Sequence, residues 1–172
     1  MHTLASINAM SAAQFSAAFG RVYEHSPWIA ARAFVLRPAA GFASRGALHA
    51  ALVATVYAAT EDEQIALLRA HPELAGKEAE ANALTAESTS EQALAGLTAM
   101  SRDEVSRLRA MNATYLEKFG FPFIVCARNN TQQAIFGTLA ARTHNFRAME
   151  LSNAMTQVGE IARLRLGDLV ND

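Results

Sequence analysis

Hydrophobic residues recur at helical spacing along most of the chain. Phe15, Phe19 and Val22 follow Ser11 at intervals of three and four residues, which predicts a helix from Ser11 toward His25. The same kind of spacing predicts further helices over residues 28–36, 46–60, 61–70, 101–118, 131–142 and 144–166, and a shorter one from Ser90. We count seven or eight helices and find no convincing sheet.

Two stretches interrupt the helical pattern. Few large hydrophobic residues lie between Ala75 and Thr89, which predicts a surface loop that is either a plain connector or part of a site. At residues 119–126, Gly120 and Pro122 precede an apolar run, which favours a short buried extended segment. In the last predicted helix the residues expected to face inward include Phe146, Met149, Val158 and Ile161.

Composition supports one helical domain. The chain has 172 residues, of which 51% are hydrophobic, with nine glycines and four prolines. This length suits a single domain with a sizeable core, and this balance favours close-packed helices over a sheet sandwich. We therefore expect an all-α fold, a single-domain bundle of about seven or eight helices over residues 1–172, without a substantial sheet.

Charge and targeting signals narrow the set of partners. The net charge is −1 and no basic block occurs, so nothing favours nucleic acid as a partner. No charged start followed by an apolar core is present, nor any run of about 18 apolar residues, so we expect no membrane association. The last four residues, 169–172, are not a peroxisomal Ser-Lys-Leu type signal, and we expect a cytoplasmic protein.

The usual signatures of metal and cofactor chemistry are missing from the sequence. Cys126 is the only cysteine, which excludes an internal disulfide and a cysteine-rich zinc site. No Gly-rich phosphate loop, dinucleotide fingerprint or GxSxG motif occurs, and no close metal-ligand spacing links His2, His25, His49 and His144. A Schiff base has only Lys77 and Lys118 available, and Lys118 is better explained by packing on aromatic rings. We expect neither a metal nor a cofactor.

His71 is the strongest candidate for chemistry. It follows the predicted helix 61–70 and directly precedes Pro72, which disfavours continuation of the helix. The negative end of the helix dipole favours a charged imidazole, and a reference pKa of about 6.5 allows proton exchange near neutral pH. The alternative is a histidine that only caps the last carbonyl groups of that helix.

A second polar group surrounds the predicted helix start at Ser90. Ser88 then lies just before the start, while Glu91 and Gln92 lie in the first turn, where exposed N–H groups favour an anionic or polar ligand. The alternative is an ordinary helix cap. Further along, Arg165 interrupts an apolar stretch and either binds a carboxylate or extends to the surface.

Several motifs follow one another in a fixed order along the chain. They are His71-Pro72-Glu73-Leu74-Ala75-Gly76, Ser88-x-x-Glu91-Gln92, and Asn112-x-x-Tyr115-x-x-Lys118-Phe119-Gly120-Phe121-Pro122-Phe123-Ile124. Arg142 with Asn145 and Glu150, and residues 161–166, complete the pattern. With these motifs in this order, the sequence resembles the 2-oxo-4-hydroxy-4-carboxy-5-ureidoimidazoline (OHCU) decarboxylase family over nearly the whole chain.

The resemblance implies an all-helical, cofactor-free enzyme, commonly a homodimer, acting on a small molecule. It would decarboxylate OHCU stereoselectively to (S)-allantoin, the third step of urate degradation. His71 would be the catalytic histidine and Glu91 its acidic partner. The substrate would be lined by Pro72, Ser88, Gln92, Phe121, Phe123, Ile124 and Arg165. Eukaryotic members often carry a peroxisomal signal, so the C-terminus fits a bacterial-type cytoplasmic enzyme.

Two alternatives from other classes stay open. A different lyase or hydrolase on the same helical scaffold would act on another heterocycle. A non-catalytic interaction module would instead need an exposed apolar face that dimer contacts do not explain.

Overall fold

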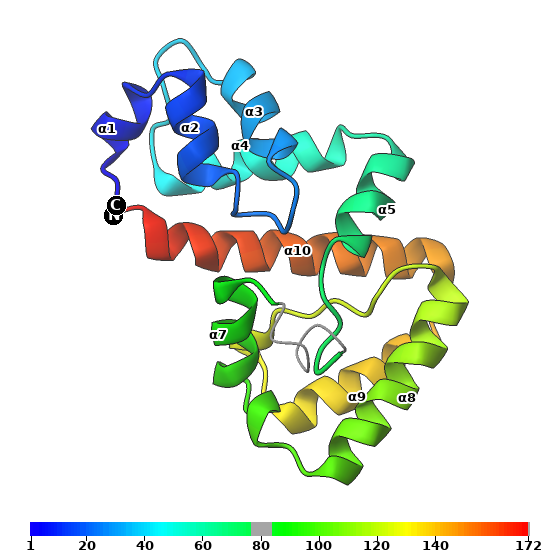
Figure 1. Ribbon diagram of the computed structural model, residues 1–172. Coiled ribbons are helices and arrows are strands. Elements are labelled where there is room, and N and C mark those ends of the chain that lie inside the picture. The colour runs from blue at the N-terminus through cyan, green and yellow to red at the C-terminus, as the bar shows by residue number, and fades with distance from the viewer. Residues whose placement is uncertain (77–83, 172) are drawn as a thin grey trace. The chain divides into compact units, whose positions relative to one another are not determined.

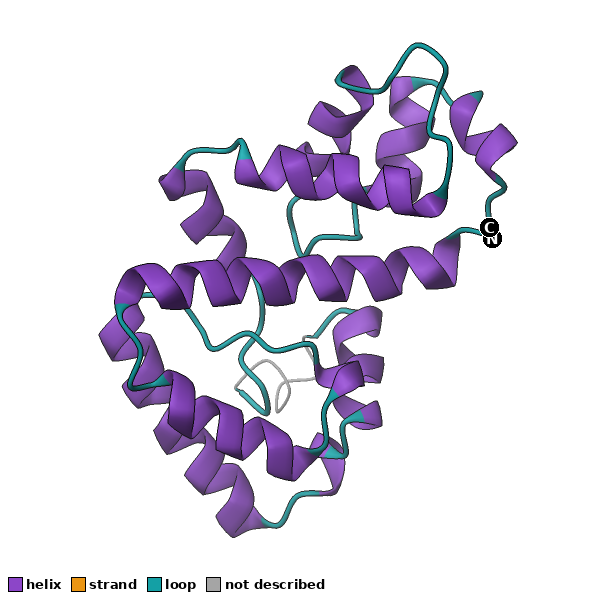
Figure 2. Cartoon of the chain, turned by 180° about the vertical axis from the view of Figure 1, so that it is seen from behind, coloured by secondary structure: helices purple, strands orange, loops and turns teal. Residues whose placement is uncertain are grey.

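The fold is all-α, as the sequence predicted. We describe residues 1–76 and 84–171 of a computed structural model (Figure 1). In these ranges nine α-helices form and no strand does (Figure 2). The helices are α1 Leu4–Asn8, α2 Ala12–Phe19, α3 Trp28–Val35, α4 Arg45–Tyr57, α5 Glu61–Arg69, α7 Ala86–Leu94, α8 Arg102–Phe119, α9 Gln132–Arg142 and α10 Arg147–Leu169. Two short 3₁₀ turns, η1 Leu97–Ala99 and η2 Ala127–Asn129, complete the described elements.

The chain divides into two compact units. One unit comprises Met1–Ala70 with Gly159–Asp172, and the other comprises His71–Val158. Helix α10 therefore contributes its first part to the second unit and its last part to the first. The single domain expected over residues 1–172 stays a prediction.

The first unit is built around buried aromatic rings of α2. Phe15 lies 4.8 Å from Phe19 and 5.5 Å from Phe34, measured between ring centroids. A capping box between Ser11 and Gln14 starts α2, but the helix ends before Gly20 instead of running toward His25. The two ends of the chain lie side by side (Figure 1), because the His2 N–H donates to the Leu169 carbonyl at 2.7 Å.

An ion pair joins α3 to the start of α5 in the first unit. Arg32 Nη2 lies 2.6 Å from Glu63 Oε1, and the Thr60 N–H donates to Glu63 Oε2 at 3.0 Å in a capping box. The hydrogen bonds from Arg32 and then from Thr60 lower the pKa of the Glu63 carboxyl from 4.5 to about 2.

This lowered pKa predicts how the contribution of Glu63 to stability depends on pH. A group whose pKa is depressed in the folded state stabilises it above its ordinary pKa and loses that effect as the pH falls through the folded value. We expect Glu63→Gln to lower the urea midpoint at about pH 6, and the difference from wild type to shrink steadily below about pH 4.5. Because the pair is partly exposed, added salt should also shrink the difference. A difference that is the same at both ends of this pH range would contradict the assignment.

The second unit is built around an aromatic cluster of α8 and the segment after it. Tyr115 lies 4.6 Å from Phe119 and 5.4 Å from Phe123 between ring centroids. A capping box of Ser101 and Glu104 starts α8, as the helix predicted over residues 101–118 requires. Gly120, with φ of +79°, ends the helix in the left-handed conformation that glycine adopts readily. Residues 121–126 then run outside any helix and are all buried, Cys126 included.

The predicted helix start at Ser90 and the predicted end of the preceding loop at Thr89 are both wrong. Helix α7 begins at Ala86, with Thr85 as its N-cap, so residues 86–89 are helical and the helix does not start at Ser90. The hydrophobic pattern did not indicate the first turn of this helix, because the buried residues of α7 are polar, namely Ser88 and Gln92. The remainder of the expected loop 75–89, including Lys77, falls largely outside the described residues.

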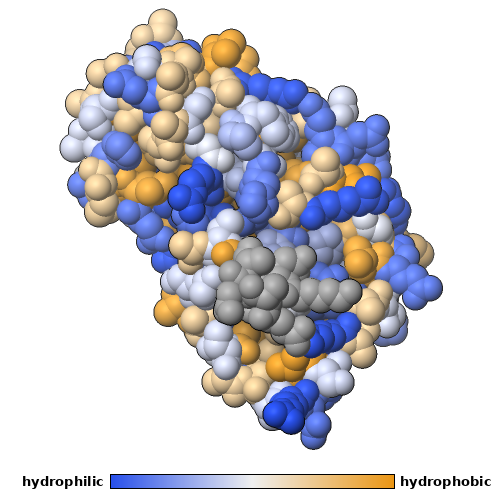
Figure 3. Space-filling view, viewed as in Figure 1, coloured by the Kyte–Doolittle hydropathy of each residue, from blue (hydrophilic) through white to orange (hydrophobic). Residues whose placement is uncertain are grey.

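The start of the last helix also differs from expectation, because α10 begins at Arg147 and leaves Phe146 before it. Phe146 is 82% exposed and Met149 is 52% exposed, so these two residues do not face inward. Val158 and Ile161, further along the helix, are buried as predicted. On the face shown in Figure 3, hydrophobic residues occur in small groups among hydrophilic ones. In the described part of the chain, no helix combines the length and the apolar character that spanning a membrane requires.

Candidate active site

His71 lies where the sequence placed it, just after α5. The helix ends at Arg69, and the N–H of its C-cap Ala70 donates to the Ala66 carbonyl at 3.0 Å. His71 is the first residue of the second unit and is only 8% exposed. The imidazole is therefore largely withdrawn from solvent, directly after the last residues of α5 in the chain.

Ser88, Glu91 and Gln92 share one face of α7. Their spacing of three and four residues places them together on the helix surface. Ser88 and Gln92 are buried, and Glu91 is half-buried. The expected cradle of exposed N–H groups is wrong, because Ser88 lies inside the first turn and its N–H donates to the Thr85 side chain at 3.2 Å. The polar groups that could bind a ligand on α7 are therefore the three side chains and not the N–H groups of the helix terminus.

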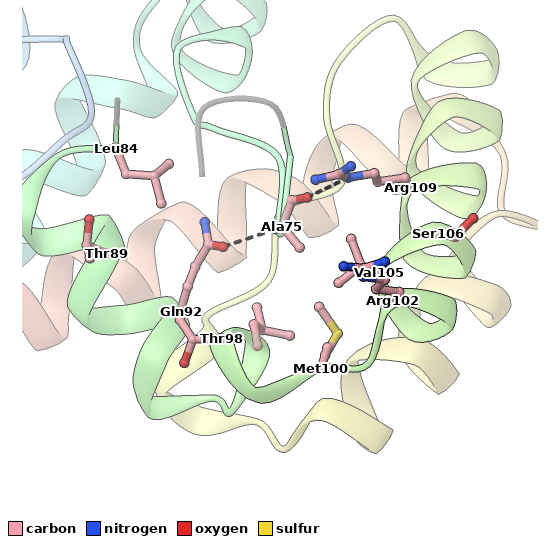
Figure 4. Close-up of a pocket in the computed structure, with 11 residues that line it drawn as sticks. Ala75, Leu84, Thr89, Gln92, Thr98, Met100, Arg102, Val105, Ser106 and Arg109 are labelled. Atoms are coloured by element: carbon pink, nitrogen blue, oxygen red, sulfur yellow. Dashed lines mark hydrogen bonds between the residues drawn. The ribbon is translucent and has the colours of Figure 1, made fainter. Parts of the chain in front are cut away.

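Side chains from α7 and α8 hold the loop that follows His71 and Pro72 (Figure 4). The Ala75 N–H donates to Gln92 Oε1 at 3.0 Å. Arg109 Nε donates to the Ala75 carbonyl at 3.0 Å, and Asn112 Nδ2 donates to the Leu74 carbonyl at 3.1 Å. Sequence reasoning missed Arg109 and noted Asn112 only as part of a motif, because contacts across 34 and 38 residues leave no local signal.

The predicted substrate-lining segment is fixed by a buried ion pair. Arg142 Nη1 donates to the Ile124 carbonyl at 2.8 Å, and its guanidinium lies 4.7 Å from the centroid of the Phe123 ring. Arg142 Nε also donates to both carboxylate oxygens of Glu150, at 2.7 and 3.1 Å. Beside this pair, burial raises the pKa of the Tyr115 hydroxyl, which keeps it protonated. The rings of Phe121 and Phe123 belong to the aromatic cluster, so their contact with substrate stays a prediction.

Arg165 belongs to the first unit and is buried. Its Nη1 atom donates to Glu24 Oε2 at 2.9 Å, with Arg165 5% and Glu24 2% exposed. The alternative of a side chain that extends to the surface is therefore wrong. Sequence reasoning missed Glu24, which lies 141 residues away along the chain.

A cavity of about 880 Å³ adjoins the loop after His71 on the side of Ala75 (Figure 4). Its size is within the range of small-molecule sites. Its lining comes from the second unit and consists of Ala75, Leu84, Thr89, Gln92, Leu97, Thr98, Met100, Arg102, Val105, Ser106 and Arg109. Of the site residues predicted from sequence, this cavity includes Gln92 alone. The other predicted site residues lie outside its lining.

Two kinds of side chain bear on metal and Schiff-base chemistry, namely possible metal ligands and the lysines. Within residues 1–76 and 84–171, no three His, Cys, Asp or Glu side chains are grouped to hold a metal ion. Lys118 Nζ donates to the Thr143 carbonyl at 2.7 Å and lies 5.0 Å from the centroid of the Phe119 ring. This confirms the packing interpretation of Lys118, while Lys77 lies outside the described residues.

Comparisons with known proteins agree along almost the whole chain. Residues 8–167 match the family model described as OHCU decarboxylase. The 2-oxo-4-hydroxy-4-carboxy-5-ureidoimidazoline decarboxylase of Amia calva is 38% identical, over 95% of this chain and 92% of that protein. The protein of the same name from Haloferax volcanii is 37% identical, over 96% of this chain and 95% of that protein.

Solved structures agree with the sequence comparisons. A crystal structure of (S)-allantoin synthase superposes with a TM-score of 0.78 at 26% identity, covering 98% of this chain. This chain spans 54% of that longer chain. A crystal structure of OHCU decarboxylase in the presence of (S)-allantoin gives a TM-score of 0.65 at 23% identity, which supports the fold alone. The family model matches residues 8–167, and both named relatives share nearly their whole length with this chain. The chain therefore belongs to the OHCU decarboxylase family.

Proposed function

We propose that this protein removes CO₂ from OHCU and releases (S)-allantoin, as the third step of urate degradation. The observation that carries the proposal is the near full-length match to relatives named for this decarboxylation, at 38% and 37% identity. We further propose that residues 1–172 act as one domain, in a cytoplasmic homodimer.

The reaction requires the protein to hold the substrate in one geometry and to direct the transfer of one proton. Loss of CO₂ leaves an electron pair on the ring carbon, and the carbonyl-bearing imidazolinone of the substrate spreads that charge. The protein must then hold the ring, keep the carboxylate in the reactive orientation, and deliver a proton to one face. Delivery to a single face gives a single enantiomer.

We assign this proton handling to His71 with Glu91. A buried histidine at the end of α5 suits proton exchange near neutral pH. Glu91 supports the assignment because it shares a face of α7 with Gln92, whose side chain binds the loop after His71. The order of the proton transfers is left open by this assignment.

The remaining residues would bind the substrate. Ser88, Gln92 and Arg165 carry the polar groups that would orient its polar substituents. The apolar contacts would come from Pro72, Phe121, Phe123 and Ile124. Arg165 keeps a planar guanidinium suited to a carboxylate, and its pair with Glu24 would fix the direction in which that guanidinium points.

The proposal is tested by the chirality of the product. Allantoin is generated from urate with the enzymes that form OHCU, with and without this protein, and followed by circular dichroism. Because OHCU also decays spontaneously, we expect a clear excess of (S)-allantoin only when the protein is present. A signal that is the same in both reactions would reject OHCU as the substrate, and a screen of other heterocycles would then separate another lyase from a non-catalytic module.

A further inference from the structure

We propose that Asn112 and Arg109 of α8 are positioning residues that hold the loop after His71 in the geometry that the reaction needs. This inference rests on the proposed role of His71. Neither residue needs to touch the substrate, because each would act on the loop backbone.

The geometry of the loop supports this role. Asn112 binds the carbonyl of Leu74 at 3.1 Å, and Arg109 binds the carbonyl of Ala75, the next residue, at 3.0 Å. From the opposite side, Gln92 of α7 accepts the Ala75 N–H at 3.0 Å. Side chains of two helices thus fix the backbone at two successive residues, which lie three and four positions after His71. We call these three side chains the loop clamp.

The backbone inside the loop clamp is strained. Ala75 has φ of +50°, in the left-handed region that residues other than glycine rarely adopt. Such a conformation persists only when the surroundings hold it, and strain of this kind gathers at functional sites. The three hydrogen bonds of the loop clamp stabilise this conformation. Without them we expect Ala75 to relax toward negative φ, which would also displace the preceding residues back to His71.

Asn112 has a second property that favours function over stability. Its side chain is 2% exposed, and while Nδ2 binds the loop, Oδ1 finds no hydrogen-bond partner among the described residues. Burying an acceptor without a partner costs free energy, which offsets part of what the Nδ2 hydrogen bond contributes. An asparagine at this buried position is therefore better explained by where it holds Leu74 than by net stabilisation.

The test compares Asn112→Ala and Arg109→Ala with Arg107→Ala. Arg107 is the matched control because it is on the same helix and its guanidinium lies 5.3 Å from the centroid of the Phe136 ring. Misplacing a catalytic group by about 1 Å can cost about 100-fold. We expect kcat for (S)-allantoin to fall by about 10- to 100-fold in both clamp variants, with KM within about threefold of wild type. The control should keep the wild-type kcat.

A second variant tests the backbone without removing any member of the loop clamp. Ala75→Val introduces a β-branched residue at a positive φ, which is strongly disfavoured. We expect the same loss of kcat at nearly constant KM. Arg109→Lys, which keeps a cationic donor, should recover part of the activity lost in Arg109→Ala.

Thermal unfolding of each variant separates positioning from general destabilisation. The inference is overturned if kcat stays near wild type in the clamp variants, or if it falls only as far as the folded fraction falls. If wild-type protein gives no excess of (S)-allantoin, the proposed function itself fails. If wild type gives the excess and the clamp variants keep it at full rate, only the present inference fails.

Discussion

Replacing His71 with alanine should slow the formation of (S)-allantoin by about 10²- to 10⁴-fold, the usual cost of losing one positioned acid or base. The imidazole is buried at the end of α5 and is the group that we assign to proton transfer. The rate is measured as the growth of the circular dichroism signal of (S)-allantoin from freshly formed OHCU. Total allantoin should fall less, because spontaneous decay continues.

His144→Ala is the matched control for this experiment. His144 is exposed and follows α9, outside the predicted site, so its removal should leave the rate unchanged. Far-UV circular dichroism of each variant shows whether it is folded. A folded His71→Ala protein that works at the wild-type rate would remove His71 from the mechanism and leave the family assignment standing.

Replacing Glu150 with alanine should lower the free energy of unfolding by about 3–5 kcal/mol, because it leaves a buried guanidinium without its carboxylate. Glu150 is fully buried and takes two hydrogen bonds from Arg142 Nε. Arg142 also holds the Ile124 carbonyl, so the loss should spread to the segment 121–124. Urea unfolding followed by circular dichroism gives the change.

Glu160→Ala provides the comparison on the same helix. Glu160 pairs with Arg163 at 3.0 Å, but both side chains are exposed. A surface pair of this kind contributes about 0–1 kcal/mol. Equal losses in the two variants would show that the Arg142–Glu150 pair contributes no more than a surface contact.

Local signals predicted much of the fold. Helix starts were predictable where a capping residue precedes a periodic run, as at Ser101 before α8 and Thr131 before α9. The end of α5 followed from Pro72. These features are written within a few residues of one another, so a single sequence is enough to find them.

Features that depend on distant partners were not predictable in this way. The start of α7 was predicted at Ser90, whereas the helix begins at Ala86. Its buried residues, Ser88 and Gln92, are polar and look like surface residues until the loop at Ala75 is seen beside them. The pairing of Arg165 with Glu24 joins two ends of the chain. Phe146 shows the opposite case, a large hydrophobic residue that the fold leaves exposed.

The candidate site came from the order of its motifs more than from any single residue. His71 alone allowed a capping interpretation, and its catalytic role is carried by the resemblance and the family match. What the structure adds is the set of side chains that hold the predicted residues: the loop clamp, Arg142 with Glu150, and Glu24. These supports are visible only when the helices are assembled.

Because Cys126 is buried, the alkylation rate of its thiol measures how often this region opens. Its thiol lies in the segment that begins with Phe121, and its N–H binds Gln157 Oε1 at 2.9 Å. An alkylating reagent can reach the sulfur only in molecules where this segment has separated from the rest of its unit. The alkylation rate of native protein therefore counts those openings, and a ligand that slows it must bind the closed form.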